Sequence, residues 1–195
     1  MKLLSAKSDA CLKNSITYFT LAFLFGLTVG TQDEAITKFQ QVFADTSTSW
    51  LFKTTYFPSN YSVCFRYERI TSEDTSFIFR QGYEVYEEST SSRRTDTSHW
   101  YGTSLKKRND GYHSMTLVRM RDRKSITYKL NHWSDKQKCF VVTFSLKAEG
   151  HCELYVRDRL PSQDGQVPEC EEALLRVCDR PVNYKWYAGN CQQIN

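Results

Sequence analysis

The chain has 195 residues, of which 26 are Lys or Arg, 22 are Asp or Glu and 40% are hydrophobic. This length fits one domain or two very small ones, and the ordinary hydrophobic content excludes wholesale disorder. Gly (8) and Pro (4) are too scarce for collagen-like or low-complexity sequence. The net charge is only +4 and the basic residues are dispersed, so electrostatics give no case for nucleic-acid binding.

The N-terminus has the pattern of a secretory signal peptide. An uncharged apolar run covers residues 16–29, three lysines precede it, and small residues follow it. The run is shorter than the roughly 20 residues that cross a bilayer, so an uncleaved membrane anchor is the less favoured alternative. We therefore expect cleavage near Gly30. The mature chain, residues 31–195, is then one extracellular, secreted domain without membrane association.

Cysteines in the expected mature chain number six, namely Cys64, Cys139, Cys152, Cys170, Cys178 and Cys191. An even number in a secreted chain predicts three disulfides, for which arithmetic alone leaves fifteen pairings. Asn60-Tyr61-Ser62 is the only N-glycosylation sequon, and it lies between two apolar segments. We expect a surface loop there, with Asn60 as the glycan acceptor.

Periodicity predicts a mostly β protein. Residues 33–44 have apolar side chains at helical spacing behind acidic residues, which predicts one short helix. From residue 49 the period changes to two, and strand-like segments follow at residues 50–56, 61–68, 77–85, 112–121, 125–133, 140–146 and 152–156. Asn109-Asp110-Gly111 predicts a hairpin turn, and Glu149-Gly150 a weaker one. Seven or eight short strands without crossover helices indicate an antiparallel barrel or sandwich.

Several polar residues fit solvated positions or packing better than a site. We expect Glu87-Glu88, Arg93-Arg94 and Lys106-Lys107-Arg108 in exposed loops; for the last, contact with an acidic partner is the alternative. The four histidines, His99, His113, His132 and His151, are isolated and lack metal-ligand spacing, so we expect no metal or other cofactor. No nucleophile elbow, phosphate-binding loop or dinucleotide motif occurs, which argues against an enzyme.

A second predicted helix covers residues 167–180 and opens at Pro168. Its apolar face contains both Cys170 and Cys178. On the preceding strands, Cys139 shares a face with Val141, and Cys152 shares one with Leu154. If these faces meet, the pairs Cys139–Cys170 and Cys152–Cys178 follow, and Cys64 is left to pair with Cys191.

The opposite faces of the same two strands point into the barrel. They carry Phe140, Val142, Phe144 and Leu146 on one strand and Glu153 and Tyr155 on the next. A largely apolar lining with one carboxylate is typical of a small-molecule pocket. Equally compatible with the pattern is a filled core in which Glu153 pairs with Arg or Lys.

The C-terminal half resembles the tick salivary lipocalins, and the similarity covers essentially the whole mature chain. The histamine-binding branch has a Cys-Asp-aliphatic segment, then Glu-Leu-aromatic, then Cys. Here these are Cys139-Phe140-Val141, Glu153-Leu154-Tyr155 and Cys170, with permitted gaps of 11 residues (142–152) and 14 residues (156–169). Phe140 replaces the family Asp.

The resemblance implies an eight-stranded antiparallel lipocalin barrel with a short N-terminal helix and a C-terminal helix packed on the outside. It supports the Cys139–Cys170 and Cys64–Cys191 pairings. It also implies a protein that holds a small host mediator such as histamine, serotonin, a leukotriene or a thromboxane. We expect the protein to be a monomer. Some members of the family instead bind host proteins, including complement factors.

Phe140 matters because a buried ammonium ion needs carboxylate partners. Glu153 corresponds to one family acid and Tyr56 to an aromatic wall, which suffices for one monoamine helped by cation–π contact. Two amine sites are not expected, and Phe140 favours a ligand with an apolar body, such as a lipid mediator. The expected ligand-binding residues are Glu153, Tyr155, Phe140, Val142, Phe144, Tyr128, Tyr56 and Trp50. The alternative is a protein-binding antagonist whose barrel is filled by Trp50, Phe140 and Phe144.

Overall fold

The computed structural model describes residues 39, 41–43, 46–56, 62–73, 76–87, 92–107, 113–158, 166–179, 184–185 and 191. All of these belong to one unit, residues 35–195. The predicted signal peptide and the sequon at Asn60 lie outside the described residues. Within the described part, no helix is both long and apolar enough to cross a membrane.

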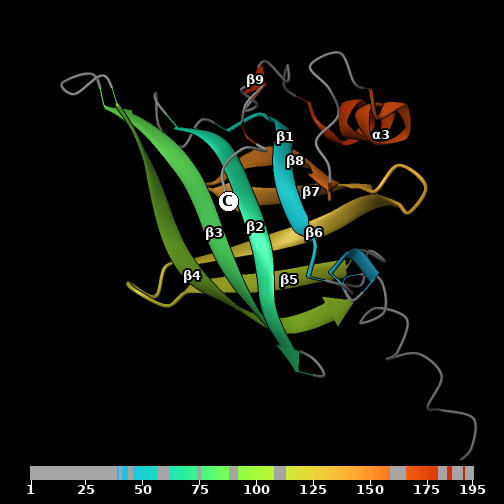
Figure 1. Cartoon of the computed structure of the whole chain (residues 1–195). Coiled ribbons are helices and arrows are strands. Elements are labelled where there is room, and N and C mark those ends of the chain that lie inside the picture. Colours follow the sequence, from blue (N-terminus) through green and yellow to red (C-terminus); the bar gives the residue numbers. More distant parts are fainter. Residues whose placement is uncertain are drawn as a thin grey trace, which may run out of the picture. The chain divides into compact units, whose positions relative to one another are not determined.

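The strands form one antiparallel sheet that closes on itself (Figure 1). They are β1 (Thr48–Thr54), β2 (Ser62–Glu73), β3 (Ser76–Glu87), β4 (Ser92–Lys107), β5 (His113–Arg119), β6 (Ser125–Ser134), β7 (Cys139–Leu146), β8 (Glu149–Arg157) and β9 (Tyr184–Lys185). Each of β2 to β7 pairs with the next strand along the chain, and β1 pairs with both β8 and β2. This closure confirms the predicted eight-stranded antiparallel barrel. The short strand β9 pairs with Lys53 and Thr54 of β1, after the part of β1 that pairs with β2.

Strand β4 was not predicted from the sequence. Arg93-Arg94 and Lys106-Lys107 were expected in loops, yet all four lie within a strand of 16 residues. Its first part has polar side chains on both faces, so no apolar alternation marks it. The strand forms because it pairs along its length with β3, where Arg94 lies opposite Val85, and then with β5. Backbone pairing with both neighbours therefore decides the conformation of a segment whose side chains do not.

The first described residues of the chain, 39 and 41–43, pack into one end of the barrel interior. Phe39, Gln41 and Val42 have helical backbone, and the Phe43 amide donates to the Phe39 carbonyl at 2.9 Å. The Phe43 ring lies 4.9 Å from Phe79 and 5.6 Å from Phe140, measured between ring centroids. The rest of the helix expected at residues 33–44 lies outside the described residues.

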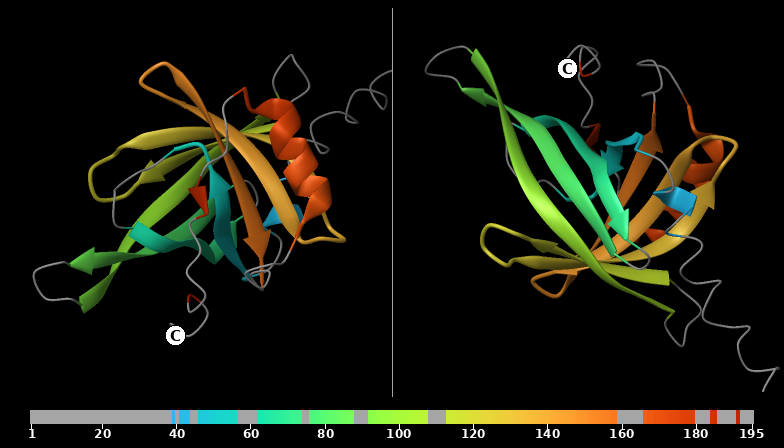
Figure 2. Two further views of the ribbon diagram at one scale, coloured as in Figure 1. Left: turned by 90° about the horizontal axis from the view of Figure 1, so that it is seen from above. Right: turned by 60° about the horizontal axis from the view of Figure 1, so that its bottom comes forward.

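Helix α3 (Pro168–Val177) lies outside the barrel against β6, β7 and β8 (Figure 2). Its buried residues, Cys170, Ala173 and Leu174, pack on outward side chains that include Val141 and Leu154. The Lys53 ammonium group and the Glu171 carboxylate form an ion pair at 2.6 Å, which joins the helix to β1. The helix therefore covers the outer face that the cysteine pattern predicted.

Three disulfides fix this outer layer, and they are the three pairs that the facing argument favoured. Cys139–Cys170 and Cys152–Cys178 join β7 and β8 to the helix and its C-cap, each with a Cα–Cα distance of 6.2 Å. Cys64–Cys191 joins β2 to the C-terminal tail, with a Cα–Cα distance of 5.3 Å. Because both sheet cysteines face outward, the opposite side chains of β7 and β8 are left to face the interior.

Candidate ligand-binding site

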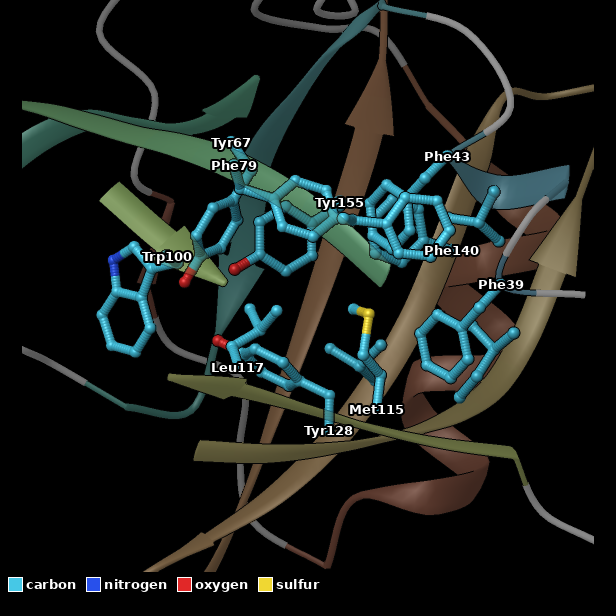
Figure 3. Packing of buried hydrophobic residues seen from close by; sticks show 14 of the residues in the cluster. Phe39, Phe43, Tyr67, Phe79, Trp100, Met115, Leu117, Tyr128, Phe140 and Tyr155 are labelled. Carbon is cyan, nitrogen blue, oxygen red and sulfur yellow. The ribbon is translucent and has the colours of Figure 1, made fainter. Parts of the chain in front are cut away.

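Packed aromatic side chains fill the half of the barrel interior next to Phe43 (Figure 3). The Phe140 ring stacks on Tyr155 at a centroid distance of 5.0 Å and an interplanar angle of 11°. A void of only about 20 Å³ is left there, lined by Phe39, Phe43, Tyr67, Phe79, Met115, Leu117, Tyr128, Phe140, Val142 and Tyr155. This half is a core without room for a mediator-sized ligand.

The other half of the interior is a cavity of about 670 Å³. Its lining residues are Leu51, Tyr56, Phe65, Tyr67, Gln81, Tyr83, Val85, Trp100, Arg119, Lys124, Ser125, Ile126, Tyr128, Phe144, Leu146 and Glu153. Lys124 and Ser125 are exposed, so the cavity reaches the surface at the turn between β5 and β6. The volume lies within the range of small-molecule pockets, roughly 300–1,000 Å³.

Glu153 lies on β8 opposite Val142 and is 5% exposed. Its Oε2 atom accepts a hydrogen bond of 2.8 Å from the Tyr155 hydroxyl. Burial raises the pKa of Glu153 to about 7, although hydrogen bonding by Tyr155 and Tyr128 acts in the opposite direction. Within the described part of the chain Glu153 has no Lys or Arg partner, so the filled-core alternative with an internal ion pair is not what the structure contains.

A chain of hydrogen bonds satisfies the polar groups across the barrel from Glu153. The Gln81 amide donates to the Tyr67 hydroxyl at 2.8 Å, and Gln81 Oε1 accepts from the Ser98 hydroxyl at 2.9 Å. The Trp100 indole N–H donates to Ser98 at 2.9 Å. Burial and the Glu153 charge raise the pKa of Tyr67, which keeps its hydroxyl protonated. These polar groups already have partners, whereas the Glu153 carboxylate lacks a counter-ion.

The predicted site residues divide between the two halves of the interior. Glu153, Tyr56, Tyr128 and Phe144 line the 670 Å³ cavity. Phe140, Val142 and Tyr155 belong instead to the packed half, although the Tyr155 hydroxyl contacts Glu153. Phe140 and Val142 were therefore assigned to the correct face of β7, but the packed half has no room for a mediator-sized ligand.

Trp50 does not face the interior, and its assignment to the lining is corrected. Simple alternation groups it with Tyr56, but a register shift interrupts β1 between Leu51 and Lys53. Leu51 consequently lines the cavity, while Trp50 packs in the outer cluster beneath the Arg66 guanidinium, whose Cζ lies 5.4 Å from the ring centroid. Beyond the bulge, Tyr56 returns to the interior, 6.1 Å from the Phe144 ring. A β-bulge of this kind reverses the side-chain alternation.

The sequence did not predict the hydrogen-bonded side chains of Gln81 on β3 and of Ser98 and Trp100 on β4. It also did not predict the charged side chains at the β5–β6 turn. Gln81 lies on the same inward face of β3 as Phe79, and Trp100 on β4 lies opposite Phe79. Alternation along β3 could have predicted the inward position of Gln81. Arg119 and Lys124 belong to a run of basic residues that looks like any solvated turn. Within the described part, no group of His, Cys, Asp and Glu is arranged to hold a metal ion.

A closed eight-stranded antiparallel barrel with an outer C-terminal helix and an internal cavity is the architecture of a lipocalin-type ligand-binding protein. A model of the tick histamine binding protein family matches residues 31–193. A search of the solved structures finds similarity to japanin from Rhipicephalus appendiculatus, in a crystal form bound to cholesterol. The TM-score is 0.54 at 11% identity, with 73% of this chain and 94% of that chain covered, so the likeness concerns the fold. A search of curated proteins gives no match.

The family match extends over most of the chain, and the protein therefore belongs to the tick histamine binding protein family. It is a ligand-binding salivary lipocalin in its general class. Three disulfides fit the oxidising extracellular setting of such proteins.

Proposed function

We propose that this protein is a secreted monomer that sequesters one small host inflammatory mediator in the 670 Å³ cavity and thereby dampens host defence. The observation that supports this most directly is Glu153, a carboxylate buried in a largely aromatic cavity with tyrosine partners but no cation. A buried charge without a counter-ion is costly to the empty protein, and a ligand that supplies a positive charge removes that cost.

A biogenic amine is the first candidate ligand. Its ammonium group would pair with Glu153, and Tyr56 and Phe144 would supply aromatic faces for its body. The packed half of the barrel, where Phe140 replaces the family Asp, supports a single amine site rather than two.

A lipid mediator is the second candidate, and the apolar part of the lining favours it. Leu51, Val85, Ile126 and Leu146 offer contacts that a small amine does not use. Because burial raises the pKa of Glu153 to about 7, its protonated carboxyl can donate a hydrogen bond to a ligand hydroxyl or carbonyl near neutral pH. A lipid anion next to an ionised Glu153 would be disfavoured.

A protein-binding antagonist, for example of a complement factor, is the remaining alternative. Its expected sign was a barrel without a cavity, filled by Trp50, Phe140 and Phe144. The 670 Å³ cavity and the outward position of Trp50 argue for the small-molecule role instead.

Isothermal titration calorimetry with histamine, serotonin, leukotriene and thromboxane analogues tests the proposal on the oxidised, secreted chain. At least one of these is expected to bind more tightly than roughly 10 μM, or about −7 kcal/mol. If an amine binds, Glu153→Gln should abolish its binding, whereas the matched control Glu149→Gln, an exposed residue on the same strand, should not. Binding of none of the four, together with recovery of a host protein in a plasma pull-down, would support the antagonist in its place.

A further inference from the structure

The cavity carries a second set of polar side chains where it reaches the surface. Arg119 ends β5, Lys124 belongs to the turn between β5 and β6, and Ser125 begins β6; all three line the cavity. Arg119 is partly buried, whereas Lys124 and Ser125 are exposed. We call these three residues the cavity lip.

Arg119 is held in a fixed orientation at the lip. Its Nε and Nη2 atoms donate to the two carboxylate oxygens of Asp122 at 2.7 Å and 2.5 Å. Its guanidinium also lies over the Trp100 ring, with Cζ 5.4 Å from the centroid. A bidentate pair fixes the plane of the guanidinium, so little conformational entropy is lost when it binds a further group. The Nη1 atom makes no hydrogen bond within the described part of the chain.

Positive charge exceeds negative charge at the lip. Asp122 is shared, because the Lys124 Nζ atom lies 3.7 Å from the same Oδ2 atom that pairs with Arg119, so one carboxylate faces two cations. Arg121 and Arg123 lie on the same turn and are exposed. Among the described lining residues, the charged ones are Arg119, Lys124 and Glu153. An anion at the lip is therefore attracted by an excess of cations, and a cation is repelled.

We propose that the cavity lip is an anion-binding subsite, and that it takes the carboxylate of an amphipathic ligand whose apolar body extends into the cavity. This inference rests on the proposed function, since it assumes that the cavity holds a small ligand. A planar carboxylate matches the donor geometry of a guanidinium, and the Ser125 hydroxyl and Lys124 ammonium groups supply further donors. The apolar side chains available to the body of such a ligand are Phe65, Val85, Ile126, Phe144 and Leu146.

Calorimetry with three probes of equal chain length tests the lip. Dodecanoate, 1-dodecanol and dodecylamine differ only in the head group. Dodecanoate is expected to bind about ten-fold more tightly than dodecanol, because its head group makes charge-assisted hydrogen bonds. This preference should shrink as the salt concentration rises, since Lys124 is exposed.

Substitutions at two exposed residues should change the preference for dodecanoate over dodecanol in opposite directions, and neither residue belongs to the hydrophobic core. Lys124→Gln should reduce the advantage of dodecanoate over dodecanol about three-fold. Asp122→Asn should increase it by a similar factor, because it removes the negative charge that offsets Arg119 and Lys124, while the Asn amide oxygen can still accept a hydrogen bond from Arg119. Lys136→Gln, in the exposed turn at the other end of β6, is the matched control and should change neither affinity.

Equal affinities for acid and alcohol in the wild-type protein, or variants that alter both probes equally, would overturn the anion subsite. If the mediators of the calorimetric panel still bind in that case, the proposed function stands and only the lip assignment falls. If neither the mediators nor any of the three probes bind, the cavity is not a ligand site and both proposals are refuted.

Discussion

Replacing Glu153 by Gln separates the cost of a buried carboxylate from its use in binding. The Gln side chain keeps an oxygen that can accept the hydrogen bond of the Tyr155 hydroxyl, so the substitution removes mainly the charge. Burial raises the pKa of Glu153 from 4.5 to about 7. At about 1.4 kcal/mol per pKa unit, this difference corresponds to about 3 kcal/mol in the free energy of unfolding.

The direction of the pH dependence follows from proton binding. Below a pH of about 4.5 the carboxyl is protonated in both the folded and the unfolded chain, and Glu153 costs the folded state no ionisation energy. Between pH 4.5 and about 7 the unfolded chain ionises first, so the folded protein binds more protons and becomes less stable as the pH rises. Above about pH 7 the loss is complete. Glu153→Gln should therefore be close to wild type in stability at low pH and more stable at high pH.

Urea unfolding of the oxidised protein, followed by far-UV circular dichroism, measures this difference. At about pH 8 the Gln variant should exceed the wild type by about 3 kcal/mol, and at about pH 4 by little. Glu149→Gln, exposed on the same strand, should match the wild type at both pH values. A Gln variant with the same advantage at both pH values, or with none, would show that Glu153 is not the buried, raised carboxyl described here.

Three further predictions concern the supports of the cavity. Tyr155→Phe removes a hydrogen bond that lowers the pKa of Glu153. The pH range over which the free energy of unfolding falls should therefore move upward. An unchanged dependence of the unfolding free energy on pH would contradict this. Phe140→Ala should lower the free energy of unfolding, measured with urea, by about 3–5 kcal/mol. Leu175→Ala, on the exposed face of α3, should change it by almost nothing. Equal losses in the two variants would show that the Phe140 side chain is not tightly packed. Cys64→Ala with Cys191→Ala removes a link between residues 127 apart and should lower the free energy of unfolding by about 5 kcal/mol; an unchanged urea midpoint would refute this.

Local patterns predicted a large part of this fold. On β7 and β8 the alternation assigned Cys139 and Cys152 to the outside and Phe144 and Glu153 to the inside, and the structure has these faces. Successive side chains of a regular strand point to opposite faces, so the residues of each face recur with a period of two, which a sequence displays directly. The helix face that contains Cys170 was predicted for the same reason, from its own period.

Where the alternation was polar or interrupted, the sequence was misleading. Strand β4 carries polar side chains on both faces of its first part and exists through pairing with β3 and β5. Because of the bulge between Leu51 and Lys53, Trp50 and Tyr56 point to opposite faces of the sheet. No residue type in that segment predicts a bulge. Both features depend on hydrogen bonds to strands distant in sequence.

By itself, the sequence determined the antiparallel β class, the outward cysteines and the inward position of Glu153, because the strand period and the side-chain direction along a regular strand are local properties. Only the tertiary structure decided that Phe43 and Phe140 fill one half of the interior while the other half stays open, and that Arg119 and Lys124 lie at its edge. Volume and charge inside a closed barrel are set by side chains from many strands at once, and no single stretch of sequence contains that sum.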